Sequence, residues 1–179
     1  MKPAIQVYTG GYFDYRFPEQ QKYDIRDIAH ALSNLCRYTG HGEQFYSVAQ
    51  HSVLVSRVIA PQHALVGLLH DAAEAYIGDV NSPLKTLLPE YRALEGRIEA
   101  ALFRSYGLHP LDIHLAKHSD LRLLATEKRD LLAHNGADTT YWALLDGVEP
   151  CEFVIRPETP HIAERRFLER YRELTRDQD

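Results

Sequence analysis

Apolar residues recur every three or four positions over most of the chain, which is the pattern of amphipathic helices. Ser47 followed by Gln50 resembles a capping box and predicts the start of one of them. The residues between helices, 78–90 and 136–150, lack the pattern, and we expect a loop with one helical turn in the first and irregular structure in the second. The predicted helices cover residues 25–39, 48–59, 61–77, 90–106, 110–133 and 160–175, and Gly40 and Gly42 are expected to end the first of them.

A small β element is predicted from the two ends of the chain. Residues 4–17 are rich in Tyr and Phe and are interrupted by Gly10-Gly11, which is typical of a β-hairpin. Residues 151–155, CEFVI, are predicted to form a short strand that pairs with this hairpin. The expected fold is therefore mainly α: one helical domain over residues 1–179 with a small hairpin and strand element from the termini. The apolar stripe of the final helix is expected to pack in the core and comprises Ile162, Phe167, Leu168, Tyr171 and Leu174.

Composition narrows the class of protein and of partner. A chain of 179 residues with 45% apolar residues fits one domain with one core. The net charge of −5 disfavours a nucleic acid as partner but is compatible with a small anion held by a metal and a few cations. Cys36 and Cys151 form no CxxC motif and fit a reducing compartment. No run has the length of a signal peptide or of the ~20 apolar residues that a membrane span needs, so we expect a cytoplasmic protein without membrane contact.

The segment HDAAEAYIGD, residues 70–79, carries the most informative chemistry. On an ideal helix, His70, Asp71 and Glu74 lie at about 0°, 100° and 40° around the axis, on the side that also carries apolar neighbours. Burying an ionised carboxylate without a partner is very costly. A divalent cation would remove that cost, and the adjacent His and Asp would give it one nitrogen and one oxygen ligand.

Further ligands must come from other helices. His51 and Asp120 are the first candidates, because each lies among apolar residues on the inner face of its predicted helix. Asp112, Glu127 and Asp130 compete with Asp120, but the last two lie in the charge run TEKRD, which is typical of a solvated face. His118 is two residues from Asp120 and would lie on a different side of the helix. Two imidazoles and two carboxylates would suit one Mn, Fe, Co, Ni or Zn ion, with Mg as a further candidate.

Three motifs, in order, carry a resemblance to a known superfamily: QHS at 50–52, HDAAEAYIGD at 70–79 and KHSD at 117–120. They resemble the H…HD…D pattern of the HD-domain phosphohydrolases. The likeness is greatest to HD-domain 5′-deoxynucleotidases and to phage deoxynucleoside triphosphohydrolases, including dATP-specific ones. It covers residues 24–133.

The resemblance implies roles for particular residues. It makes His51, His70, Asp71 and Asp120 the metal ligands. Glu74 would orient or deprotonate the attacking water, and Asp79 would assist the leaving group or position water. Arg37 and Tyr38 fall where the deoxynucleotidases have an Arg-Trp pair that holds phosphate and sugar. Two departures stand out, Tyr38 in place of the tryptophan and Ile77 in place of a threonine. Lys85 and Lys117 are further candidates for phosphate contact.

The implied reaction is attack of a metal-activated water on phosphorus in a 2′-deoxynucleotide, with release of orthophosphate from a monophosphate. The alternatives are release of tripolyphosphate from a dNTP, hydrolysis of a cyclic or signalling nucleotide, and a non-catalytic module that senses nucleotides. The expected partner is thus a small nucleotide, and the resemblance also allows a homo-oligomer.

Overall fold

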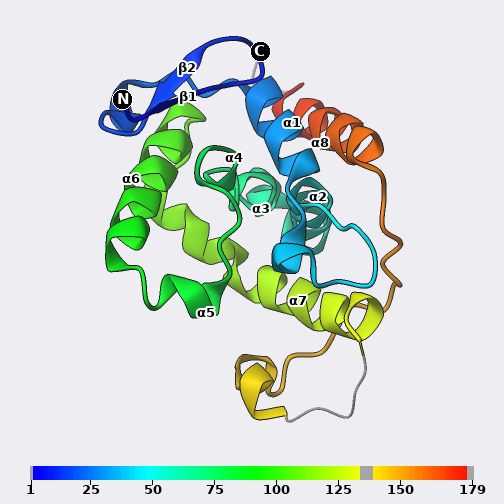
Figure 1. Ribbon diagram of the computed structural model, residues 1–179. Helices are drawn as coiled ribbons and strands as arrows, with labels where there is room; N and C mark the ends of the chain where they lie inside the picture. The colour runs from blue at the N-terminus through cyan, green and yellow to red at the C-terminus, as the bar shows by residue number, and fades with distance from the viewer. Residues whose placement is uncertain (1, 134–138, 177–179) are drawn as a thin grey trace.

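Helices make up most of the structure, a computed structural model that describes residues 2–133 and 139–176 (Figure 1). They enclose one core, and a small antiparallel sheet lies beside it, so the mainly helical fold is confirmed. The α-helices are α1 (Ile25–Asn34), α2 (Val48–Val58), α3 (Ala64–Leu69), α4 (Glu74–Ile77), α5 (Ser82–Lys85), α6 (Pro89–Ser105), α7 (Lys117–Leu131) and α8 (Pro160–Thr175). The 3₁₀ segments are η1 (Pro18–Gln20), η2 (Arg37–Gly40), η3 (Pro61–His63), η4 (Pro110–Ala116) and η5 (Thr139–Leu145).

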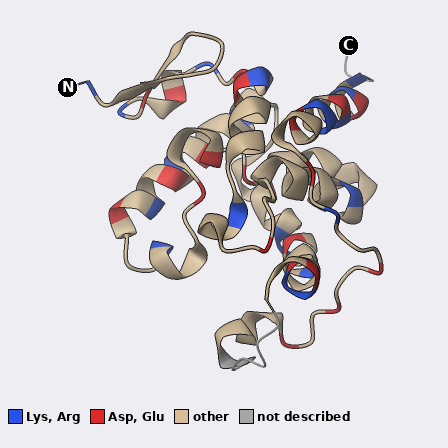
Figure 2. Ribbon diagram, turned by 45° about the vertical axis from the view of Figure 1, so that its right-hand side comes forward, with Lys and Arg blue, Asp and Glu red and all other residues tan. Residues whose placement is uncertain are grey.

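Helix α2 is the centre of the packing, with contacts to α1, α3, α7 and α8. Phe167 of α8 and Ile28 of α1 are fully buried between these helices. Leu168, Tyr171 and Leu174 pack against the same core, which confirms the predicted stripe of α8 except for Ile162, a half-buried residue outside this core. The opposite side of α8 carries acidic and basic residues mixed along its length (Figure 2).

Side-chain caps start helices α1 and α2, and the one at Ser47 was predicted from the sequence. The Asp24 carboxylate accepts a hydrogen bond from the Arg26 amide at α1, and the Ser47 hydroxyl accepts one from the Gln50 amide at α2. The predicted capping box at α2 is only half present, however. The Gln50 side chain donates to the Arg156 carbonyl oxygen at 2.8 Å and accepts from the Glu158 amide at 2.9 Å, so it ties α2 to the segment before α8 instead of closing its own cap.

The predicted continuous helix over 61–77 is wrong. Helix α3 ends at Leu69, and the next residues form turns until α4 begins at Glu74. Amides bond here to carbonyls three residues back, as Glu74 does to Asp71 at 3.0 Å. Three residues per turn place side chains that are three apart directly above one another. The tightening therefore brings Asp71 and Glu74 onto one side of the chain.

Helix α1 ends earlier than predicted: it stops at Asn34, and Arg37–Gly40 form the 3₁₀ segment η2. Helix α7 begins later than predicted. The range 110–133 was expected to be one helix, but it divides into the 3₁₀ segment η4 and then α7, which ends at Leu131. Two expectations nearby hold: 78–90 contains one short helix, α5, and η5 is a short irregular 3₁₀ segment. Residues 134–138, part of the second expected irregular region, lie outside the described residues.

The predicted strand at 151–155 is also wrong. The one sheet among the described residues is β1 (Ala4–Gln6) with β2 (Tyr12–Asp14), so the β element comes from the N-terminal region alone. Side chains of α7 hold the 151–155 segment in place of a sheet. Thr126 Oγ1 accepts from the Cys151 amide and Asp130 Oδ2 accepts from the Ile155 amide, each at 2.8 Å. Among the described residues, no helix has the length and apolar character to cross a membrane.

Candidate metal centre

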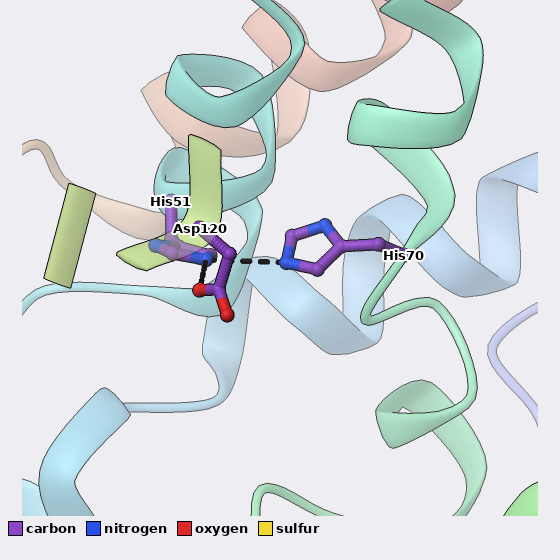
Figure 3. A group of neighbouring side chains, drawn as sticks. All are labelled: His51, His70 and Asp120. Atoms are coloured by element: carbon purple, nitrogen blue, oxygen red, sulfur yellow. Dashed lines mark hydrogen bonds and ion pairs between the residues drawn. The ribbon is translucent and has the colours of Figure 1, made fainter. Parts of the chain in front are cut away.

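Three predicted ligands converge from three separate segments (Figure 3). His51 extends from α2, His70 from the turn after α3 and Asp120 from the first turn of α7. His51 Nε2 lies 3.3 Å from His70 Nε2 and 3.3 Å from Asp120 Oδ1. One ligand atom from each residue lies within 4.8 Å of the others, and both rings are buried, so this group could hold a metal ion.

Asp71 joins the group from the same turn as His70. Its Oδ2 lies 3.1 Å from His70 Nε2 and 3.6 Å from His51 Nε2. All four residues that the sequence suggested as ligands are therefore neighbours. Two nitrogens and two oxygens are a donor set that divalent transition metals accept.

The hydrogen bonds of the two rings fit a cation between them. His70 Nδ1 donates to the Gly67 carbonyl oxygen at 2.8 Å, and His51 Nδ1 donates to Glu127 Oε1 at 2.6 Å. Metal-binding histidines almost always donate their other ring N–H to a carbonyl or a carboxylate. Both Nε2 atoms then carry lone pairs that face each other, beside the oxygens of Asp71 and Asp120. Only a cation or a proton can stabilise such an arrangement.

The approach of α3 to α2 depends on Gly67. A Cβ at this position would lie 3.0 Å from Ile59 Cγ2 and 3.1 Å from Ser56 Cα. Backbone atoms cannot move away cheaply, so any side chain here would push the two helices apart. The glycine thus allows His51 and His70 to reach the same point.

The pKa values of the ligands reflect the same balance of charge. Burial and the Arg37 guanidinium favour a neutral His51 ring, but the carboxylates of Glu127 and Asp120 outweigh them and raise its pKa to about 9. Burial disfavours the charged form of Asp120, yet the contact with His51 lowers its pKa to about 2. Burial also opposes the charge of Asp71, but the adjacent His70 and His51 rings lower its pKa well below the ordinary range. A bound cation would take the place of the proton that these groups attract.

Glu127 is a residue of this cluster that the sequence analysis did not assign to it. It was predicted to lie on a solvated face, but it is fully buried. Its Oε1 accepts from His51, and its Oε2 accepts from Arg37 Nη2 at 3.1 Å and from the Tyr38 hydroxyl. Burial alone would raise the pKa of Glu127, but Arg37 and His51 lower it to about 2. Its position seven residues after Asp120, on the same face of α7, is the sequence signal that could have identified it.

Asp130 was also predicted to lie on a solvated face, and this prediction is wrong. Its carboxylate is 7% exposed and is bound by Arg129 at 2.6 Å, away from the ligands. Asp130 therefore holds the 151–155 segment and does not face solvent.

Arg37 and Tyr38 lie at the edge of the site, on η2. Arg37 Nη1 is 3.5 Å from Asp71 Oδ2, and the guanidinium is 12% exposed. Tyr38 and Thr39 both have positive φ, 58° and 54°. Such a conformation is uncommon outside glycine and is a real outlier for a β-branched residue. Strain of this kind persists only where the surroundings hold it, and it clusters at functional sites.

Glu74 and Asp79 lie beside the ligands. Glu74 is buried, and its Oε2 has no hydrogen-bond partner among the described residues. Burial and the charges of Asp71 and Asp79 raise the pKa of Glu74 well above the ordinary range. Burial is also the main cause of a raised pKa at Asp79. Both groups therefore keep a proton to a higher pH than exposed carboxylates do.

The two candidate lysines are already paired with acids. Lys85 Nζ lies 2.5 Å from Glu95 Oε1, on α6, and 3.8 Å from Glu74 Oε1. Lys117 is exposed and lies 3.6 Å from Asp120 Oδ2. Glu95 is buried and was not singled out by sequence. Lys85 thus contacts Glu74 and a second carboxylate, while Lys117 lies at the rim.

Comparison with known proteins identifies the family. No protein-family model matches this chain. It is 36% identical over 119 residues to the uncharacterized protein RCAP_rcc00048 of Rhodobacter capsulatus, across 60% of this chain and 61% of that protein. It is 41% identical over 172 residues to the uncharacterized protein YfdR of Escherichia coli (strain K12), across 96% of this chain and 95% of YfdR. The chain therefore belongs to the same family as YfdR.

Proposed function

We propose that this protein is a metal-dependent phosphohydrolase of the HD type that acts on 2′-deoxynucleoside 5′-monophosphates. One observation carries the proposal: the ligand atoms of His51, His70 and Asp120 converge, and Glu74 lies beside this group with a buried carboxylate oxygen that has no partner among the described residues. Hydrolysis by water needs a site for a cation next to a carboxylate that can accept a proton from the attacking water. The resemblance of the three motifs to HD-domain enzymes supports a phosphate ester as the substrate.

The residues would divide the chemistry between them. A bound divalent cation would supply Lewis acidity, which stabilises charge on a phosphoryl oxygen and makes water a stronger acid. Glu74 would take the proton of the attacking water at Oε2, because Oε1 faces Lys85 at 3.8 Å. The water oxygen forms a bond to phosphorus while the bond from phosphorus to O5′ breaks. Asp79, whose pKa is raised by burial, would return a proton to O5′.

Arg37 and Tyr38 would line the substrate side. The Tyr38 hydroxyl is already bound to Glu127, so the face of its ring is the part available to a sugar. Arg37 keeps one guanidinium nitrogen, Nη1, directed at Asp71 and the ligand cluster. In this position it would neutralise a phosphate that binds at the metal.

The monophosphate is favoured over the dNTP alternative by the charges around the site. Arg37, Lys85 and Lys117 each lie within 4.0 Å of at least one carboxylate. A triphosphate brings more negative charge than a monophosphate and would need cations that these ion pairs do not leave free. The non-catalytic sensing module is disfavoured because Glu74 and Asp79 are both present and partly or fully enclosed beside the ligands.

A panel of metals and nucleotides tests the proposal. The purified protein is stripped with a chelator, reloaded with Mn²⁺, Co²⁺, Zn²⁺, Ni²⁺ or Mg²⁺, and incubated with each dNMP, NMP and dNTP. We expect metal-dependent release of orthophosphate from dNMPs and none from the stripped protein. Release of tripolyphosphate from dNTPs would select the alternative reaction, and nucleotide binding without turnover under every metal would select the sensing module.

A further inference from the structure

Glu127 connects a metal ligand with both residues expected to contact substrate. One carboxylate oxygen accepts from His51 Nδ1 at 2.6 Å. The other accepts from Arg37 Nε at 3.3 Å, from Arg37 Nη2 at 3.1 Å and from the Tyr38 hydroxyl. One oxygen of the Glu127 side chain thus contacts a candidate metal ligand, and the other contacts the two residues expected to bind substrate.

The burial of Glu127 indicates a reason beyond stability. Its side chain is 0% exposed, and the Arg37 side chain is 12% exposed. Removing such a pair of charges from water is costly, and well-packed apolar residues would often serve stability as well or better. The bonds from His51, Arg37 and Tyr38 offset this cost. What they add beyond stability is a fixed geometry at His51.

The bond to Glu127 fixes which nitrogen of His51 faces the cluster. With its proton on Nδ1, the ring presents the lone pair of Nε2 to the space shared with His70 and Asp120. The carboxylate also fixes the plane of the ring, so that Nε2 stays 3.3 Å from Asp120 Oδ1.

Arg37 extends the connection to a second ligand. It lies between Glu127 and Asp71, with Nη1 3.5 Å from Asp71 Oδ2. The contacts close into a ring: Glu127 to His51, His51 to Asp71, Asp71 to Arg37, and Arg37 back to Glu127. Glu127 is the member of this ring that is not itself expected to touch cation or substrate.

We propose that Glu127 is a positioning residue of the metal centre, which directs His51 Nε2 toward the cation and holds Asp71 through Arg37. The inference rests on the metal site of the proposed function and not on the reaction. Partners of this kind typically change metal affinity by ~10- to 100-fold when they are lost. Glu127 also anchors the turn at Tyr38 and Thr39, whose positive φ needs such support.

Metal titration of a matched set of variants tests the role. Glu127→Gln keeps the shape of the side chain but removes its charge. Asp130→Asn makes the same change one turn later on α7, at a carboxylate that holds the Ile155 amide instead of a ligand. Both proteins are stripped, and the dissociation constant for Co²⁺ is measured by competition with a chromophoric chelator, together with the visible spectrum of the bound Co²⁺.

We expect Glu127→Gln to weaken Co²⁺ binding by ~10- to 100-fold and to alter the Co²⁺ spectrum, which reports ligand geometry. Asp130→Asn is expected to change stability but neither the affinity nor the spectrum. If Glu127→Gln does not fold, Arg37→Lys serves in its place, because lysine keeps the charge but cannot bridge Glu127 and Asp71 with a planar fork. A several-fold loss of affinity is expected there too.

Three outcomes separate this inference from the proposed function. Wild-type protein that binds no cation would overturn both. Wild-type protein that binds Co²⁺ with an affinity and spectrum unchanged in Glu127→Gln, or in Arg37→Lys where that variant is used, would overturn the positioning role alone. Weakened binding in the variant, together with a wild-type protein that hydrolyses no nucleotide, would support the positioning role and overturn the reaction.

Discussion

His51 Nε2 and Asp120 Oδ1 lie 3.3 Å apart, although the two residues come from different helices, α2 and α7. A buried imidazole and a carboxylate in this arrangement, with a second imidazole opposite, form the group that could hold a metal ion. The first prediction therefore concerns Asp120.

Asp120→Asn is expected to weaken binding of Co²⁺ or Zn²⁺ strongly while the fold is kept. The amide oxygen is neutral and is a poorer ligand than a carboxylate, so the loss should at least equal the ~10- to 100-fold effect of losing an outer hydrogen-bond partner. Calorimetric titration of the stripped protein measures the affinity, and circular dichroism checks the helices. His118→Asn is the control, because His118 is exposed two residues away on the same helix. Equal weakening in both variants would contradict the assignment of Asp120.

Glu74→Gln is expected to bind the cation normally and to lose turnover. Its Oε2 is the buried carboxylate oxygen that lies without a partner beside the ligands, among the described residues, and glutamine cannot accept a proton there. Loss of a general base typically reduces kcat by ~10²- to 10⁴-fold. The assay is orthophosphate release from a dNMP with the metal content measured in parallel, and Glu152→Gln, at an exposed residue, is the control. Full turnover by Glu74→Gln would remove Glu74 from the mechanism.

The convergence of His51, His70, Asp71 and Asp120 could be predicted from sequence because each one is a polar residue among apolar neighbours. Burial of such a group requires a partner wherever the helices meet. The apolar stripe of α8 and the cap at Ser47 could also be predicted, because both follow from the spacing of residues within one helix.

The features that the sequence analysis missed depend on distant partners. In the sequence, Glu127 has the pattern of a solvated residue. Its ion-pair partner Arg37 lies 90 positions earlier in the chain, and only the fold places the two side by side. The tightened turn after Leu69 accompanies a bond from the His70 ring to the Gly67 carbonyl oxygen and the close packing of α3 on α2. The segment 151–155 has strand-forming residues, but α7 supplies hydrogen bonds in place of a sheet edge.

Phe167→Ala is expected to destabilise the fold by about 3–5 kcal/mol, the range for removing a large aromatic side chain from a core. Phe167 is fully buried where α8 packs on α1 and α2. Phe153 is 40% exposed, and Phe153→Ala should cost far less. Urea unfolding followed by circular dichroism gives both values. Similar losses in the two variants would mean that α8 does not contribute its apolar face to the core.

The stability of the metal-free protein is expected to fall as the pH rises toward 7, in part because of Glu99. Burial and the neighbouring charge of Glu95 raise the pKa of Glu99 from 4.5 to about 7. Between these two values the folded protein holds a proton that the unfolded chain has released, so the free energy of unfolding decreases with rising pH. Below pH 4.5 Glu99 is neutral in both states and makes no such contribution.

Glu99→Gln removes this titration and should be more stable than the wild type above pH 7. The gain should be near zero at pH 4 and grow to about 1–2 kcal/mol at pH 8, since one pKa unit corresponds to ~1.36 kcal/mol and solvent screens part of the side chain. Urea unfolding at a series of pH values, with a chelator present, measures the difference between the two proteins. A difference that stays constant from pH 4 to pH 8 would show that Glu99 has the same pKa in the folded and unfolded states.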